Sequence, residues 1–277
     1  MNILNWFKLV SKRLSHINNS RYDLEILLSF VIKKSKSWII GFNDYQLSEN
    51  EVVQLEKLII RRSLGEPIAY LLGEQEFWSL PFKVSKEVLI PRPETEILVE
   101  LCLYKLQTIN VANILDLGTG SGVIALSIAS IKKECHITGI DCMQSAITIS
   151  KYNAKILQIS NVHFICSDWF SSINSKLFHV IVSNPPYISI NEYSIIRNNL
   201  KYEPIKSLVS HSCGLGDIMY IIQNAKNYLY SHGWLLIEHG WNQKYRVQNL
   251  FKYNDFINIK TYQDYSGHDR VTIGQKK

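Results

Sequence analysis

A glycine-rich segment, Asp116-Leu117-Gly118-Thr119-Gly120-Ser121-Gly122, constrains the fold of this chain more than any other feature. Its first two residues end a short apolar run, residues 113–117, and it precedes an apolar stretch with helical spacing, residues 123–128. Glycines allow such a turn to be tight and let the backbone approach a ligand without interference from a Cβ atom. The order strand, glycine turn and helix therefore predicts the ligand-binding turn of a parallel α/β sheet.

The rest of the chain after the glycine turn supports this prediction, because short apolar runs alternate there with helical stretches. Asp141 ends the second of these runs, about 20 residues after the turn, where a carboxylate binds ribose hydroxyls. The expected strands are residues 136–140, 162–166, 178–183 and 234–237, with 256–260 and 270–273 as a closing antiparallel pair. The sequence thus predicts a fold of the α/β class and a cofactor that carries ribose.

The spacing of the glycines indicates which cofactor is bound. Gly118, Gly120 and Gly122 follow the pattern Gly-x-Gly-x-Gly, whereas dinucleotide sites use Gly-x-Gly-x-x-Gly to place a pyrophosphate at a helix N-terminus. S-adenosylmethionine has no phosphate, so its turn faces ribose and the methionine end. The spacing favours this methyl donor.

The motif Asn184-Pro185-Pro186-Tyr187 directly follows the expected strand 178–183, at the edge of the sheet where open α/β sheets bind substrates. Residues that precede proline are restricted to extended geometry, so the turn is stiff. The side-chain oxygen of Asn184 and the carbonyl of Pro185 can together accept both hydrogens of one NH2 group. The ring of Tyr187 offers a face to a planar acceptor.

The first part of the chain has a different pattern, with apolar residues at helical spacing in 23–33 and a capping-box pair, Ser48 and Glu51. Residues 77–84 are aromatic and β-prone around a central proline, which predicts a short hairpin. We expect a helical domain over 1–75, a hairpin linker over 76–90 and the α/β domain over 91–277.

Together, the glycine motif and Asn184 to Tyr187 resemble class I methyltransferases that modify planar nitrogen in amides or exocyclic amines. The segment Ile90-Pro91-Arg92-Pro93-Glu94-Thr95-Glu96 narrows the resemblance to the PrmC/HemK family of protein-glutamine N5 methyltransferases. Ser121 and the turn at residues 214–217 are small departures from the family pattern. Matching segments also occur at residues 21–28, 76–78, 167–170, 203–204, 238–240 and 269–271, so the resemblance covers essentially the whole chain.

This resemblance implies a Rossmann-like, seven-stranded mixed sheet behind a small helical domain that docks the substrate. It also implies transfer of a methyl group from S-adenosylmethionine to the N5 nitrogen of the glutamine in the Gly-Gly-Gln motif of class-I peptide chain release factors, in support of translation termination. The implied cofactor-binding residues are Gly118, Thr119, Gly120, Ser121, Gly122, Asp141, Asp168, Trp169 and Asn184. The implied catalytic residues are Asn184, Pro185 and Tyr187, and the implied substrate-binding residues are Asn184, Pro185, Pro186 and Tyr187.

Two alternatives remain open. A DNA adenine-N6 methyltransferase uses a similar turn, but it needs a sizeable basic region to flip and read its base, and the extra domain here is small and helical. The net charge of +6 permits a non-catalytic protein that binds the cofactor and RNA or the ribosome. The intact motif from Asn184 to Tyr187 argues against that class.

Other residue types suggest expectations about partners and location. The five cysteines never form Cys-x-x-Cys and the eight histidines never form His-x-x-x-His, so we expect no disulfide framework and no metal. No apolar run reaches the roughly 18 residues of a membrane helix. We expect a cytoplasmic monomer without a DNA or membrane partner. Arg92 is expected to line the site and His239 to be a core or rim histidine, while Glu94, Glu96 and Glu238 have no assigned role.

Overall fold

The structure is a computed structural model that describes residues 1–17, 19–174 and 176–277. The chain divides into two compact units, Met1–Glu74 and Gln75–Lys277, each with a hydrophobic core. We describe each unit by itself. Within the described residues, no helix is both long and apolar enough to cross a membrane.

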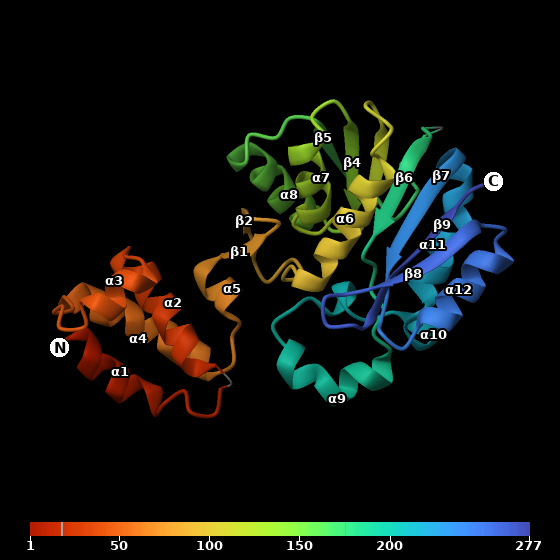
Figure 1. Cartoon of the computed structure of the whole chain (residues 1–277). Helices are drawn as coiled ribbons and strands as arrows, with labels where there is room; N and C mark the ends of the chain where they lie inside the picture. Colours follow the sequence, from red (N-terminus) through yellow and green to blue (C-terminus); the bar gives the residue numbers. More distant parts are fainter. Residues whose placement is uncertain (18, 175) are drawn as a thin grey trace. The chain divides into compact units, whose positions relative to one another are not determined.

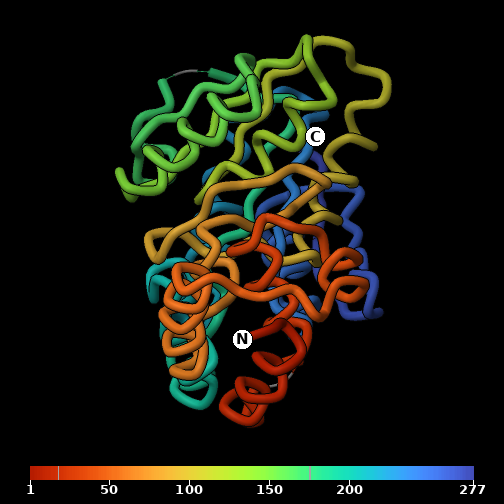
Figure 2. Tube along the Cα trace, turned by 90° about the vertical axis from the view of Figure 1, so that its left-hand side faces the viewer, coloured from red at the N-terminus to blue at the C-terminus, as the bar shows by residue number. Residues whose placement is uncertain are grey.

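The first unit consists of helices, which Figure 1 labels and Figure 2 shows as coils in red and orange. Its core contains Trp6, Leu24, Leu28 and Leu55. The predicted capping box is confirmed: the backbone nitrogen of Ser48 donates to the Glu51 carboxylate at 2.7 Å, and the Ser48 hydroxyl accepts from the Glu51 nitrogen at 3.3 Å. The helices are α1 (Ile3–Ser11), α2 (Ser20–Ile32), α3 (Lys36–Gly41), α4 (Glu49–Ser63) and α5 (Ile68–Leu72).

The second unit contains a seven-stranded mixed sheet in the order β5-β4-β3-β6-β7-β9-β8, which confirms the expected fold class (Figure 1). The first five strands in this order are parallel, whereas β9 is antiparallel to both β7 and β8. The strands are β3 (Asn113–Leu117), β4 (His136–Asp141), β5 (Val162–Cys166), β6 (Phe178–Ser183), β7 (Leu229–Glu238), β8 (Ile257–Gln263) and β9 (Asp269–Gln275). β7 begins before the predicted residue 234, because its polar first half carries no apolar signal.

Helices cover both faces of this sheet. Residues of α6 (Glu96–Lys105), α7 (Val123–Ile131) and α8 (Gln144–Ile156) belong to the core on one face. Residues of α11 (Gly216–Ala225) and α12 (Lys244–Tyr253) belong to the core on the other. The remaining elements are α9 (Ile190–Leu200), α10 (His211–Gly214), η1 (Pro93–Thr95), η2 (Ile205–Ser207) and η3 (Lys226–Tyr228).

A two-stranded sheet of β1 (Glu74–Phe77) and β2 (Leu80–Lys83) forms at the predicted hairpin. Phe77 and Phe82 are buried in the same core as α6, α7 and α8. The buried Asn153 of α8 accepts from the backbone nitrogen of Lys83 at 2.8 Å and donates to the carbonyl of Ser121 at 2.8 Å. One side chain thus joins the hairpin to the glycine turn.

Candidate active site

The glycine turn connects the end of β3 to the start of α7. Gly118, Gly120 and Gly122 all have positive φ, at 73°, 56° and 85°. Glycine adopts such values far more readily than other residues, and at Gly122 an added Cβ atom would also lie 3.0 Å from Leu126 and 3.1 Å from Phe164. The turn is fixed to the neighbouring strand, because the nitrogen of Thr119 donates to the carbonyl of Ile140 at 2.8 Å.

Asp141 lies at the end of β4, beside the glycine turn. Its carboxylate accepts from the nitrogen of Gly120 at 3.0 Å and from the nitrogen of Met143 at 2.9 Å. Burial raises the pKa of Asp141, and these two hydrogen bonds lower it. Each carboxylate oxygen accepts only one of these bonds and keeps a second lone pair. The carboxylate can therefore also accept from the two hydroxyls of a ribose.

Asp116, the first residue of the motif, lies behind the turn and is fully buried. Its Oδ2 accepts from the Thr119 hydroxyl at 2.6 Å and from the nitrogen of Ala125 at 3.2 Å. Among the described residues, its Oδ1 has no partner. Burial raises the pKa of Asp116 to about 7, against these two hydrogen bonds, which lower it. The side chain of Thr119 is thus turned inward, where it supports the shape of the turn.

A cavity of about 310 Å³ opens beside the turn. It brings together Gly118, Gly120, Asp141, Asp168, Trp169 and Asn184 from the predicted set, as well as Pro186. Thr119, Ser121 and Gly122, which were also predicted to bind the cofactor, do not line it. Residues that the sequence did not predict also line it: Leu89, Ile140, Cys142, Met143, Ser167, Lys206, Ser207, Val209 and Asp217.

The chemistry of this lining fits S-adenosylmethionine. Among the described residues that line it, Asp141, Asp168 and Asp217 provide three carboxyl groups and Lys206 provides one cation. Such a lining suits a donor with a positively charged sulfur and disfavours a pyrophosphate. The glycines leave the backbone accessible, and Asp141 is placed for the ribose.

A second, smaller cavity of about 130 Å³ lies on the other side of Asn184. Leu89, Asn184 and Ser207 line both cavities. Pro185 and Tyr187 line only the smaller one, and Pro186 lines only the larger one. The motif therefore contributes to the walls of both cavities, and Asn184 faces both.

Polar contacts hold the turn from Asn184 to Tyr187 on several sides. The amide nitrogen of Asn184 lies 3.2 Å from the hydroxyl oxygen of Thr95, to which it donates. The Tyr187 hydroxyl donates to Glu238 at 3.4 Å, and the Tyr187 carbonyl accepts from Gln243 at 2.9 Å. Burial, and the charge of Glu238 next, raise the pKa of Tyr187, so its hydroxyl stays protonated.

Arg92 lines the smaller cavity and forms an ion pair with Glu203. The Glu203 side chain is only 3% exposed, and it also accepts from the backbone nitrogen of Ile90 at 3.1 Å. This carboxylate therefore fixes both the segment before Arg92 and the guanidinium itself. The expectation that Arg92 lines the site agrees with this position.

Other polar residues have roles within the fold. Glu96 accepts from the backbone nitrogen of Trp78 at 2.8 Å and so holds the turn of the hairpin. His239 is fully buried, with its ring nitrogens 2.9 Å from the carbonyl of Gly240 and 2.8 Å from the Thr272 hydroxyl. This burial agrees with the expectation of a core or rim histidine, and it lowers the pKa of His239.

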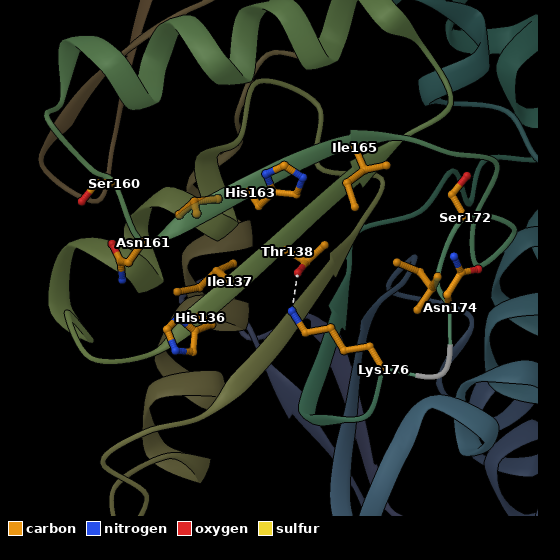
Figure 3. Close-up of a pocket in the computed structure, with 12 residues that line it drawn as sticks. His136, Ile137, Thr138, Ser160, Asn161, His163, Ile165, Ser172, Asn174 and Lys176 are labelled. Atoms are coloured by element: carbon orange, nitrogen blue, oxygen red, sulfur yellow. Dashed lines mark hydrogen bonds between the residues drawn. The ribbon is translucent and has the colours of Figure 1, made fainter.

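A larger cavity, about 520 Å³, lies at the beginning of β4 and β5, whereas the candidate site lies at the ends of these strands. Figure 3 shows Lys176 directed toward Thr138, to whose hydroxyl it donates at 3.3 Å. None of the predicted site residues lines this cavity. Its size alone gives no reason to place the chemistry there.

Comparisons with known proteins agree with this geometry. Residues 94–201 match the family "Methyltransferase small domain", and residues 5–73 match the family "PrmC N-terminal domain". The chain is 51% identical over its full length to the release factor glutamine methyltransferase of Buchnera aphidicola from Acyrthosiphon pisum, covering 99% of that protein. It is 41% identical to the enzyme of the same name from Escherichia coli K12, covering 99% of each chain.

Among solved structures, the chain is similar to the 16S rRNA N2 G1207 methyltransferase of T. thermophilus in complex with AdoMet and guanosine. The TM-score is 0.54 and the sequence identity 16%, and the match covers 74% of this chain and 50% of that one. At this identity the likeness concerns the fold alone.

Proposed function

Because the chain belongs to the family of release factor glutamine methyltransferases, we propose that it methylates class-I peptide chain release factors. The acceptor is the side-chain amide nitrogen, N5, of the glutamine in their Gly-Gly-Gln motif. The observation that carries the proposal is the position of Asn184 on the walls of both cavities, with its amide nitrogen turned to Thr95. Its oxygen is then available to the acceptor.

The difficulty of the reaction lies in the acceptor, since the lone pair of an amide nitrogen is delocalised into its carbonyl. The side-chain oxygen of Asn184 and the carbonyl of Pro185 accept the two hydrogens of the glutamine amide and direct its nitrogen toward the larger cavity. S-adenosylmethionine supplies a methyl group that is already activated by the positive charge on sulfur. Catalysis then comes mainly from positioning and electrostatics.

The methyl transfer requires no strong base to deprotonate the amide beforehand. The S–CH3 bond breaks as the N–CH3 bond forms, and the cationic product amide loses one proton to solvent. The ring of Tyr187 lines the smaller cavity and packs against the planar amide. Asn184, Pro185 and Tyr187 are therefore the proposed catalytic residues, and Pro186 completes the rigid turn.

On the donor side, Asp141 binds the ribose hydroxyls, and Asp168, Trp169 and the backbone of Gly118 and Gly120 surround the cofactor. Thr119, Ser121 and Gly122 act through the shape of the turn. The inward hydrogen bond of Thr119 and the contact of the Ser121 carbonyl with Asn153 support this division of roles.

Specificity for one glutamine requires a second surface, because a single side chain offers few contacts. We assign this surface to the helical domain, residues 1–75, which the hairpin linker 76–90 joins to the methyltransferase domain 91–277. In this proposal the protein acts as a cytoplasmic monomer and does not methylate DNA.

The proposal is tested by incubating a purified class-I release factor with the protein and S-adenosylmethionine labelled in its methyl group. Tandem mass spectrometry should place one labelled methyl on the glutamine of Gly-Gly-Gln, and a factor with that glutamine replaced by alanine should gain none. Parallel reactions contain duplex and single-stranded DNA at physiological salt. Label in DNA adenine, with none in the factor, would overturn the proposal.

A further inference from the structure

Glu238, at the end of β7, is 1% exposed, and Tyr187 is the partner of its Oε1. Among the described residues, its Oε2 has no hydrogen-bond partner. Arg270 is a nearby cation, but its guanidinium donates to Asp264 at 3.0 and 3.1 Å, and within the described residues no ion pair joins it to Glu238. An incompletely satisfied buried carboxylate is costly to a fold. A residue of this kind calls for a reason other than stability.

Thr95 connects Glu238 to the acceptor site. The side chain of Thr95 is buried, and its hydroxyl donates to the carboxyl group of Glu238. Burial raises the pKa of Glu238, and this hydrogen bond lowers it by a smaller amount. The same hydroxyl oxygen accepts from the amide nitrogen of Asn184 at 3.2 Å. A chain of polar contacts therefore runs from Asn184 through Thr95 to Glu238.

The direction of these contacts follows from the first of them. The NH2 group of Asn184 donates to the hydroxyl oxygen of Thr95, which leaves the single hydroxyl hydrogen of Thr95 for the carboxyl group of Glu238. The oxygen of Thr95 then has only lone pairs to offer Asn184, which must turn its NH2 group toward Thr95. The side-chain oxygen of Asn184 is left on the opposite side, where it can accept from a substrate amide.

We propose that Glu238 and Thr95 are positioning residues that fix the amide of Asn184 with its oxygen toward the acceptor, while Glu238 also holds the hydroxyl of Tyr187 at the other end of the turn. This inference rests on the proposed function, in which the oxygen of Asn184 binds the glutamine amide. Without the carboxylate, the side-chain amide of Asn184 has two orientations of similar energy. In one of them its NH2 group faces the NH2 group of the substrate glutamine, and no hydrogen bond can form.

The test uses two variants. Thr95→Val removes the hydroxyl at nearly constant volume, and Glu238→Gln can donate to Thr95 and so reverse the direction of the hydrogen bonds between Glu238, Thr95 and Asn184. Both variants should lower kcat at least tenfold, with less than threefold change in KM for the release factor and in the affinity for S-adenosylmethionine. Thr95→Ser keeps the hydroxyl and should restore at least half of the wild-type kcat. The matched control is Thr138→Val, at a second buried threonine that stands on β4 and lines the larger, distant cavity; its kcat should stay near wild type.

A double-mutant cycle separates positioning from a structural role. In the Asn184→Ala background, Thr95→Val should cause less than a twofold further loss of kcat, because the group that it orients is already absent. An equal loss in both backgrounds, or wild-type kcat for Thr95→Val in the native background, would overturn the inference. These outcomes all presuppose an active wild type, whereas a wild type that leaves the factor unmethylated contradicts the proposed function itself. If Glu238→Gln does not fold, Thr95→Val still decides the question.

Discussion

A Cβ atom placed on Gly214 would lie 2.2 Å from the carbonyl oxygen of Tyr187. The same carbonyl accepts from Gln243, which also reaches the carbonyl of Gly214 at 3.3 Å. The loop at the end of α10 therefore packs backbone to backbone against the proposed catalytic turn. Gly214 also has a φ of 80°, so both its space and its conformation require glycine.

We expect Gly214→Ala to displace the turn at Tyr187 and to lower kcat at least tenfold. The left-handed conformation alone costs about 1–2 kcal/mol for a non-glycine residue. Gly267→Ala is the matched control, since Gly267 has a φ of 82° and a Cβ atom added to it would meet nothing within 4 Å. Thermal unfolding and kcat of both variants separate the conformational cost from the contact. Equal kcat for the two variants would show that the contact with Tyr187 has no effect.

Asp141→Ala should weaken binding of S-adenosylmethionine at least tenfold in calorimetry. The change removes one or two charge-assisted hydrogen bonds, each of about 1.5–3 kcal/mol. Asp269→Ala removes a carboxylate that pairs with Lys244 outside both cavities, and it should leave the affinity unchanged. Wild-type affinity in a folded Asp141→Ala protein would remove this residue from the proposed cofactor site, and saturable binding of NAD would contradict the specificity for a methyl donor.

Asn184→Ala should leave binding of the donor largely intact and slow methyl transfer by two or more orders of magnitude, as expected for the loss of an essential polar group. Asn184→Asp keeps the shape and an acceptor oxygen, and we expect reduced but measurable transfer. Asn174→Ala, at an exposed asparagine beside the distant cavity, serves as the control. Single-turnover rates measure the transfer step, and full rates in both Asn184 variants would make the turn purely structural.

Asp116 should make stability depend on pH. Its pKa is about 7 in the folded protein because of burial, whereas an unfolded aspartate ionises near pH 4. Between these values the folded state holds a proton that the unfolded state has lost, so the free energy of unfolding falls as pH rises through this window.

Asp116→Asn removes this titration and should show a smaller fall between about pH 4 and pH 7 than wild type, by on the order of a few kcal/mol. Urea denaturation of both proteins without the cofactor, at several pH values, measures the difference. The same pH dependence in both proteins would mean that Asp116 is ionised throughout.

Deletion of residues 1–73 should keep donor binding but strongly lower kcat/KM for the intact release factor, because binding energy remote from the reacting atoms is lost. Methylation of a short Gly-Gly-Gln peptide, already poor, should barely change. The second unit has its own core, which supports folding of the shortened chain. Undiminished kcat/KM on the intact factor would contradict a docking role for the helical domain.

The sequence predicted those parts of the site that lie at the ends of strands. Gly118, Asp141 and Asn184 directly follow or end β3, β4 and β6, and parallel neighbours bring these ends to one edge of the sheet. The local sequence pattern and the sheet topology are sufficient to predict where such residues lie. The same holds for β3 and β6, whose apolar runs have the bounds that the structure shows.

Contacts between distant segments could not be predicted in this way. Thr95 stands in a short 3-10 helix before α6 and contacts Asn184, which lies 89 residues further along the chain, so no local signal marks it. Gln243 contacts Tyr187 across 56 residues. The pattern of the glycine motif also cannot tell which side chains turn inward, as Thr119 does toward Asp116.

The wall that the two cavities share has a thermodynamic consequence. Since Leu89, Asn184 and Ser207 face both cavities, an occupant of either cavity changes the surroundings of the other. Linkage then requires reciprocity: the factor by which the donor changes the affinity for the glutamine is the factor by which the glutamine changes the affinity for the donor. Methyl transfer removes the charge on sulfur and enlarges the amide in one event, and the same reciprocity then applies to the affinities of the two products.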